Sequence, residues 1–134
     1  MKTFFAILGA VPRALAYELF VERPARRLNR RAGELRQRYS EEPNLAYLDQ
    51  AIELMKQAAD RVQNGSPNKA TYLTNLGRAF STRFKANLRR EDIERAVTYL
   101  QEAVANTPAS SPDRASRLEA LARAIHDRDG AGRP

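Results

Sequence analysis

The sequence predicts an all-α protein made of antiparallel helix–turn–helix repeats. Three observations lead to this fold class: apolar residues recur at helical spacing, the pattern repeats at a constant offset of 45 residues, and no stretch shows the period-two alternation of a strand. The offset relates three runs, which are ARRLNRRAGELRQRY (25–39), ATYLTNLGRAFSTRF (70–84) and ASRLEALARAIHDRD (115–129).

A second apolar block obeys the same offset without a gap. It aligns Leu48 with Ile93 and Met55 with Leu100. Two separate blocks that share one offset predict paired helices that recur along the chain. We therefore expect five helices, at residues 25–39, 44–63, 68–85, 90–106 and 112–128.

Turn-forming residues separate these predicted helices. They lie in the stretches SEEPN (40–44), NGSPN (64–68) and NTPASSPD (106–113). Asn44 or Pro43 is expected to open the second helix, and Ser111 is expected to cap the last helix, with Pro112 as its first residue. The lone glycine of the middle run, Gly77, predicts a close approach between two helix backbones.

Composition limits the chemistry of the chain. The 134 residues are enough for a single domain, and they include no cysteine and one histidine. Disulfides, thiolate metal sites and multi-histidine metal centres within one chain are therefore excluded. The sequence has no converging acid–base pair and no phosphate-binding glycine loop. We expect no catalytic residues, no metal and no cofactor, and hence a protein that is not an enzyme.

Positive charge is concentrated near the N-terminus. Residues 1–40 carry nine Lys and Arg against three Glu, which accounts for six of the seven net charges. Because no aromatic residue is interleaved with the arginines, we expect a solvated helix face and no nucleic-acid partner. This basic patch consists of Arg23, Arg26, Arg27, Arg30 and Arg31, with Glu18, Glu22 and Glu34 as neutralising partners.

Residues 1–22 match the repeat poorly and allow three interpretations. They can form an N-terminal capping helix that covers the open end of the array and is split at Pro12. They can instead be a secretory signal, with residues 1–16 removed at Ala14-Leu15-Ala16. The third alternative is a membrane-surface contact through residues 1–31, in which apolar side chains are backed by the arginines.

The repeat resembles the tetratricopeptide (TPR) class, in the long-period form of fungal and bacterial proteins. The matching stretches are YLDQAIELMKQA, NKATYLTNLGRAFSTRF, DIERAVTYLQEAV and PDRASRLEALARAI. The resemblance covers roughly residues 25–128 and implies a short right-handed α-solenoid at 23–129, followed by a flexible tail at 130–134. Asp129 departs from the pattern, because the other copies have Tyr39 and Phe84 there, and it predicts that the last helix ends exposed.

The resemblance also implies a function and a binding face. We expect a cytoplasmic, non-catalytic scaffold that binds a protein or peptide in a groove lined by the first helix of each repeat. Accessory subunits of enzymes or biosynthetic pathways and secreted proteins are the alternatives. Self-association through the open repeat ends is a further expectation. With 44–63 and 90–106 as groove helices, the expected contacts are Glu53, Lys56, Gln57, Glu94, Thr98 and Gln101.

Overall fold

Five long helices pack together in a computed structural model that describes residue 9 and residues 11–131. The helices are α3 (Arg23–Glu41), α4 (Leu45–Arg61), α5 (Lys69–Asn87), α6 (Arg90–Ala105) and α7 (Arg114–Gly130). A short helix, α2 (Arg13–Tyr17), and a π-helical turn, η1 (Glu18–Glu22), precede them. The described residues include no strand, so the all-α prediction is confirmed, and each predicted helix end lies within about two residues of its observed position.

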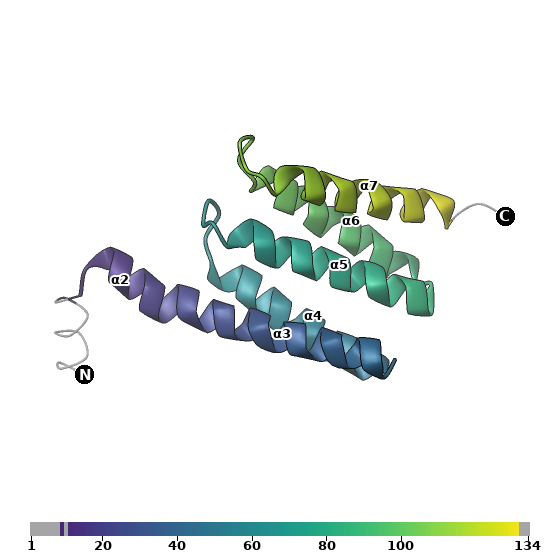
Figure 1. The fold of residues 1–134 in the computed structure, drawn as a ribbon, viewed down its shortest axis with the longest axis horizontal. Coiled ribbons are helices and arrows are strands. Elements are labelled where there is room, and N and C mark those ends of the chain that lie inside the picture. The colour runs from purple at the N-terminus through teal and green to yellow at the C-terminus, as the bar shows by residue number, and fades with distance from the viewer. Residues whose placement is uncertain (1–8, 10, 132–134) are drawn as a thin grey trace.

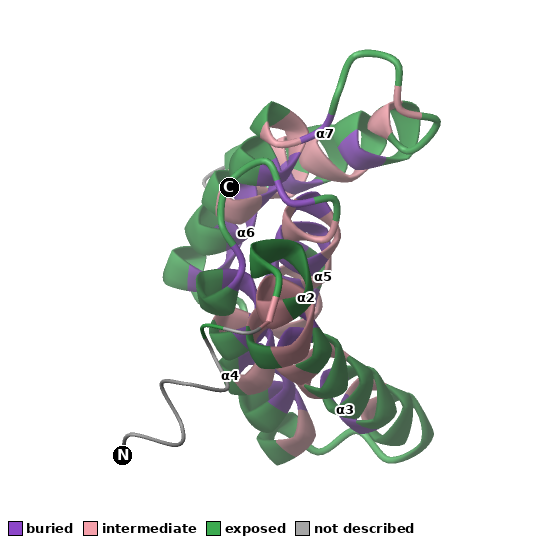
Figure 2. Ribbon diagram, turned by 90° about the vertical axis from the view of Figure 1, so that its left-hand side faces the viewer, coloured by how far each residue is buried: buried purple, intermediate pink, exposed green. Residues whose placement is uncertain are grey.

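The helices form two layers. Neighbouring helices run antiparallel, with α3, α5 and α7 in the nearer row of Figure 1 and α4 and α6 behind them. Seen nearly end-on, α3 and α7 lean toward the same side of α5 (Figure 2). The α3/α5/α7 layer is therefore the inner side of a curved array.

The connections divide the chain into hairpins. Tight turns at residues 42–44 and 88–89 join α3 to α4 and α5 to α6, and these two pairs have the most extensive contacts. The longer loops at 62–68 and 106–113 link one hairpin to the next. The first helix of each hairpin is thus α3 or α5, and α7 follows the second hairpin without a hairpin partner among the described residues. This grouping differs from the expected first helices at 44–63 and 90–106, because the apolar stripes alone do not show which neighbour each helix contacts more closely.

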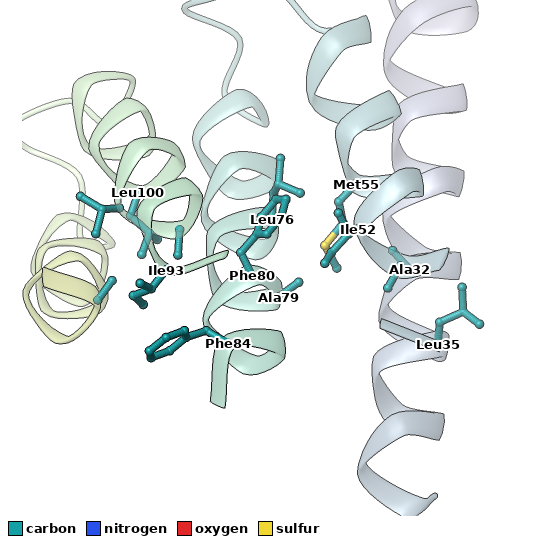
Figure 3. Packing of buried hydrophobic residues seen from close by; sticks show 14 residues of the cluster. Ala32, Leu35, Ile52, Met55, Leu76, Ala79, Phe80, Phe84, Ile93 and Leu100 are labelled. Atoms are coloured by element: carbon teal, nitrogen blue, oxygen red, sulfur yellow. The ribbon is translucent and has the colours of Figure 1, made fainter. Parts of the chain in front are cut away.

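The main apolar core lies between the two layers. Leu76 and Phe80 of α5 lie toward Ile52 and Met55 of α4, whereas Phe84 lies on the α6 side of α5 (Figure 3). Phe80 also stacks on Tyr99 of α6, with ring centroids 5.6 Å apart. The three middle helices, α4, α5 and α6, are therefore each held through both of their neighbours, as the repeated stripes predict.

Residues 13–41 form one continuous helical segment, because α2, η1 and α3 follow each other without a break. The π-helical turn lies directly before Pro24, which has no N–H to donate and would otherwise disrupt a regular helix. Two side chains tie the segment to the 62–68 loop. The Tyr17 hydroxyl accepts a hydrogen bond from the Gln63 N–H at 3.1 Å, and the buried Glu22 carboxylate accepts two from that loop.

The helix-start predictions have mixed outcomes. Asn44 caps α4, since its Oδ1 accepts a hydrogen bond from the Ala46 N–H at 3.0 Å. The prediction for Ser111 is wrong: Asp113 is the N-cap of α7, and the Ser111 hydroxyl accepts from the Asp113 N–H one turn earlier. Two prolines in this loop, Pro108 and Pro112, leave room for a separate turn before the helix begins.

Much of the predicted N-terminal and C-terminal segments lies outside the described residues. The three interpretations of residues 1–22 therefore stay predictions, although α2 does begin directly after Pro12. At the other end α7 continues through Gly130, and 132–134 are not described. No helix within the described part of the chain is both long and apolar enough to cross a membrane.

Candidate functional site

The inner layer contains a hollow between α3, α5 and α7. Polar side chains of α5 form its floor, Arg36 of α3 flanks it on one side, and α7 forms the other wall. We call it the inner hollow. Its charged and hydroxyl-bearing lining residues are Arg36, Arg78, Ser81, Thr82, Lys85, Ser116, Glu119, Arg123 and Asp127.

Helical periodicity explains why α5 presents polar groups here. Thr71, Asn75, Arg78, Thr82 and Lys85 follow each other every three or four residues, on the side of α5 away from its buried apolar stripe. Hydrogen bonds fix this floor to both walls. Asn75 Nδ2 donates to Asn29 Oδ1 of α3 at 3.1 Å, and Arg78 Nη2 donates to the Ser116 hydroxyl of α7 at 3.3 Å.

The cations of the inner hollow outnumber its carboxylates. Arg123 forms an ion pair with Glu119 within α7. Arg36, Arg78 and Lys85 form no ion pair with any other residue that the structure describes. Asp127 is the remaining carboxylate of the lining. The inner hollow is therefore a site of net positive charge.

Burial and a neighbouring cation both disfavour the charge of Arg36. Burial lowers the pKa of its guanidinium below the ordinary value, and the neighbouring charge of Arg78 lowers it further. An arginine remains protonated at neutral pH even so. Half-buried Arg36 and exposed Arg78 repel each other, and an anion placed between them would stabilise both charges.

The lining can bind an anionic group but contains no metal-binding cluster. Guanidinium, ammonium and hydroxyl groups supply donors for carboxylate or phosphate oxygens. Across the described residues, no group of three or more His, Asp or Glu side chains is placed to hold a metal ion.

The six predicted groove contacts lie in the other layer, on α4 and α6, and none lines the inner hollow. Five of them are exposed, and Lys56 is half-buried with its Nζ 5.7 Å from the Phe80 ring centroid. Glu94 pairs with Arg90 at 2.9 Å, and the Thr98 hydroxyl donates to the Glu94 carbonyl oxygen. The exposed members of the set, whose role in binding stays a prediction, are Glu53, Gln57, Glu94, Thr98 and Gln101.

The basic patch on α3 is partly neutralised. Glu18 pairs with Arg26 and lies 3.9 Å from Arg23, as expected for a neutralising partner. The hydrogen bond from Arg26 lowers the pKa of the exposed Glu18 carboxyl. Glu22 instead turns inward. The remaining patch members are exposed and form no ion pair with another described residue: Arg27, Arg30 and Arg31.

Sequence analysis did not identify two buried polar clusters. In the first, Glu22 accepts hydrogen bonds from the Ser66 hydroxyl at 2.6 Å and from Asn68 Nδ2 at 2.8 Å. In the second, the Arg83 guanidinium donates two hydrogen bonds to the Asp92 carboxylate, of 2.7 and 2.9 Å. A sequence signal for the second cluster was that arginine recurs at positions 38, 83 and 128. The carboxylate partner of Arg83, Asp92, has no equivalent in the other copies.

No family model matches this chain, and no curated protein or solved structure matches it either.

Proposed function

We propose that this protein is a non-catalytic, TPR-like scaffold that holds an acidic segment of a protein or peptide in the inner hollow. The observation that carries the proposal is the pair Arg36 and Arg78, two neighbouring cations that no described carboxylate neutralises. A carboxylate of the ligand would take the place of the missing partner.

The TPR-like part of the proposal is supported by the repeat and by the two-layer packing. The same 45-residue offset relates α3 to α5 and α5 to α7, and these are the helices of the inner layer. In a short right-handed α-solenoid, the first helix of each hairpin lines the inner face. The inner hollow then corresponds to the groove that the resemblance predicts, formed by α3, α5 and α7.

An extended acidic segment fits the lining better than a compact anion does. The cations come from three helices and follow α5 from Arg78 to Lys85, which is about two helical turns. Several carboxylates along a peptide can meet several of these cations in turn. Hydroxyls of Ser81, Thr82 and Ser116 lie among them and can bind backbone or side-chain oxygens.

Fluorescence anisotropy with labelled ten-residue peptides tests this function. An Asp/Glu-rich peptide is compared with a Lys-rich one and with a neutral one of equal length. The double variant Arg36→Gln/Arg78→Gln removes two positive charges from the inner hollow. The matched control, Arg27→Gln/Arg30→Gln, removes the same charge from the basic patch on α3.

We expect the hollow variant to weaken binding of the acidic peptide at least about tenfold and the patch variant to weaken it less than about threefold. Equal effects of the two variants would show that net charge, rather than the inner hollow, attracts the peptide. Selective loss in the patch variant would move the site to α3. Absence of binding by the acidic peptide overturns the acidic-segment proposal.

A second candidate function is contact with an anionic membrane surface through the N-terminal half of the 13–41 helical segment. Leu15 and Phe20 are 47% and 50% exposed there, close in sequence to Arg13 and Arg23. Apolar side chains beside arginines are the two signals that such binding needs. Co-sedimentation with vesicles containing phosphatidylserine tests it, and Leu15→Glu/Phe20→Glu should abolish the bound fraction.

A further inference from the structure

The outward side of α7 carries an apolar stripe that no helix covers within the described residues. Ala115, Leu118 and Ala122 are exposed, Leu118 to 43%, and Ile125 is half-buried. Asp129 closes the stripe at its C-terminal end. We call these five positions the α7 stripe.

The corresponding positions of α5 are all buried. The 45-residue offset relates the α7 stripe to Ala70, Leu73, Gly77, Phe80 and Phe84, which are all buried. Helix α6 contacts this stripe of α5, since Gly77 approaches Leu100 and Phe80 stacks on Tyr99. The α7 stripe therefore has the same pattern as the stripe of α5 that binds a helix, but within the described residues it lacks the helix that covers the α5 stripe.

We propose that the α7 stripe binds the α7 stripe of a second copy of this chain, with the two helices antiparallel. The spacing of Ala115, Leu118, Ala122 and Ile125 is three, four and three residues, which is the spacing of a helix pair. In the antiparallel arrangement Leu118 meets Ala122 of the second copy, and Ile125 meets Ala115 of the second copy. Every layer then combines one large side chain with one small side chain, so the face is complementary to itself.

The charges beside the stripe permit this contact. Beside the stripe Glu119 is paired with Arg123, and Asp129 at its end is paired with Arg128 at 3.1 Å, so these charges are neutralised within each copy. Pairing through the same face on both copies gives a closed two-fold dimer. The competing contact, between the α7 stripe and exposed Leu15 or Phe20 at the other end of the array, would be head-to-tail and open-ended. This inference uses outward residues of α7 and does not depend on the proposed function of the inner hollow.

Multi-angle light scattering of the full chain tests the stoichiometry. We expect a mass of twice 15.1 kDa at high concentration, and Leu118→Glu should raise the dimer dissociation constant at least about tenfold. Leu15→Glu is the matched control, because it places the same charge at a similarly exposed leucine at the other end of the array. Circular dichroism of both variants checks that the helices are retained.

Engineered cysteines test the orientation, since the chain has no cysteine of its own. A mixture of Leu118→Cys and Ala122→Cys proteins should form a disulfide-linked heterodimer faster than either protein forms a homodimer. Faster homodimer formation would contradict the antiparallel register. A strict monomer at all concentrations overturns the proposal, and so does loss of association in Leu15→Glu, because only the head-to-tail contact needs Leu15.

Discussion

Gly77 of α5 lies directly against the Leu100 side chain of α6. A Cβ atom added at Gly77 would lie 2.6 Å from Leu100 Cγ and 3.2 Å from the Ala96 carbonyl oxygen. Gly77→Ala should therefore lower the free energy of unfolding by about 1–2 kcal/mol, because overpacking outweighs the roughly 1 kcal/mol that alanine gains in helix propensity. Urea denaturation followed by circular dichroism measures this change.

Gly33 provides the matched control for this prediction. It lies within α3, and an added Cβ would meet nothing within 4 Å. Gly33→Ala should raise the free energy of unfolding by about 0.5–1 kcal/mol through helix propensity alone. Changes of the same sign in the two variants would contradict the close contact at Gly77.

The Arg83–Asp92 pair should be a major stabilising contact between α5 and α6. The Asp92 side chain is 5% exposed and also accepts a hydrogen bond from Asn87. We expect Asp92→Asn to lower the free energy of unfolding by about 1–3 kcal/mol, since it weakens charge-assisted hydrogen bonds in a buried position. Asp49→Asn removes the other, 58% exposed carboxylate partner of Arg83 and should cost at most about 1 kcal/mol.

The contribution of Asp92 should depend on pH. Burial by itself raises the pKa of this carboxyl, but hydrogen bonds from Arg83 and Asn87 outweigh burial and hold the pKa below the ordinary value of 3.8. The stabilisation is therefore complete above the unfolded-state pKa and disappears as pH falls through the lower folded-state pKa. The stability difference between wild type and Asp92→Asn should stay constant from neutral pH to about pH 5 and shrink below about pH 4. A difference that grows on acidification would contradict this linkage.

The Tyr72 hydroxyl is buried without a hydrogen-bond partner among the described residues. Burial raises the pKa of this phenol, and the nearby Glu22 carboxylate raises it further. Tyr72→Phe should raise the free energy of unfolding by about 0.5–1 kcal/mol, because it removes an unsatisfied polar group and keeps the ring. Tyr17→Phe removes a hydroxyl that does accept a hydrogen bond and should have the opposite sign. Thermal melts of the two variants separate these outcomes.

Leu88 ends α5 in the left-handed region, with φ at 57° and ψ at 23°, and its side chain is 74% exposed. A leucine at such an angle costs roughly 1–2 kcal/mol, because its Cβ crowds the following carbonyl oxygen. We expect Leu88→Gly to be more stable than Leu88→Ala by about 1 kcal/mol, since only glycine relieves the crowding. Equal stability of the two variants would show that the turn is not strained.

The all-helical fold class and the helix bounds could be predicted from the sequence, because the information for them is local and repeated. Helical spacing around Leu48, Leu73 and Ile93 marks each buried stripe, and Gly77 marks the closest contact. The sequence indicates less clearly which helices contact each other when they lie far apart in the chain. The grouping of helices into hairpins follows from the tight turns. Because of this grouping, the inner side is formed by α3, α5 and α7, whereas the sequence pattern predicted the groove on α4 and α6.

The candidate site was harder to predict than the fold. Arg36 and Arg78 are 42 residues apart in the sequence, and their proximity comes only from the packing of both α3 and α5 on α4. Glu22 looked like a neutralising partner for the basic patch, but it faces Ser66 and Asn68 because the π-helical turn before Pro24 changes the register of the helix. Asp129, by contrast, is exposed at the end of α7, as its departure from the repeat predicted.

The two kinds of connection lie at opposite ends of the array. Residues 62–68 and 106–113 emerge at one end, and the tight turns 42–44 and 88–89 lie at the other (Figure 1). Extra residues beside exposed loop positions such as 109–110 can extend into solvent at small entropic cost, whereas lengthening a tight turn would separate two closely packed helices. The molecule therefore has one edge that tolerates insertions and one that does not, and peptide tags or grafted segments belong at the tolerant edge.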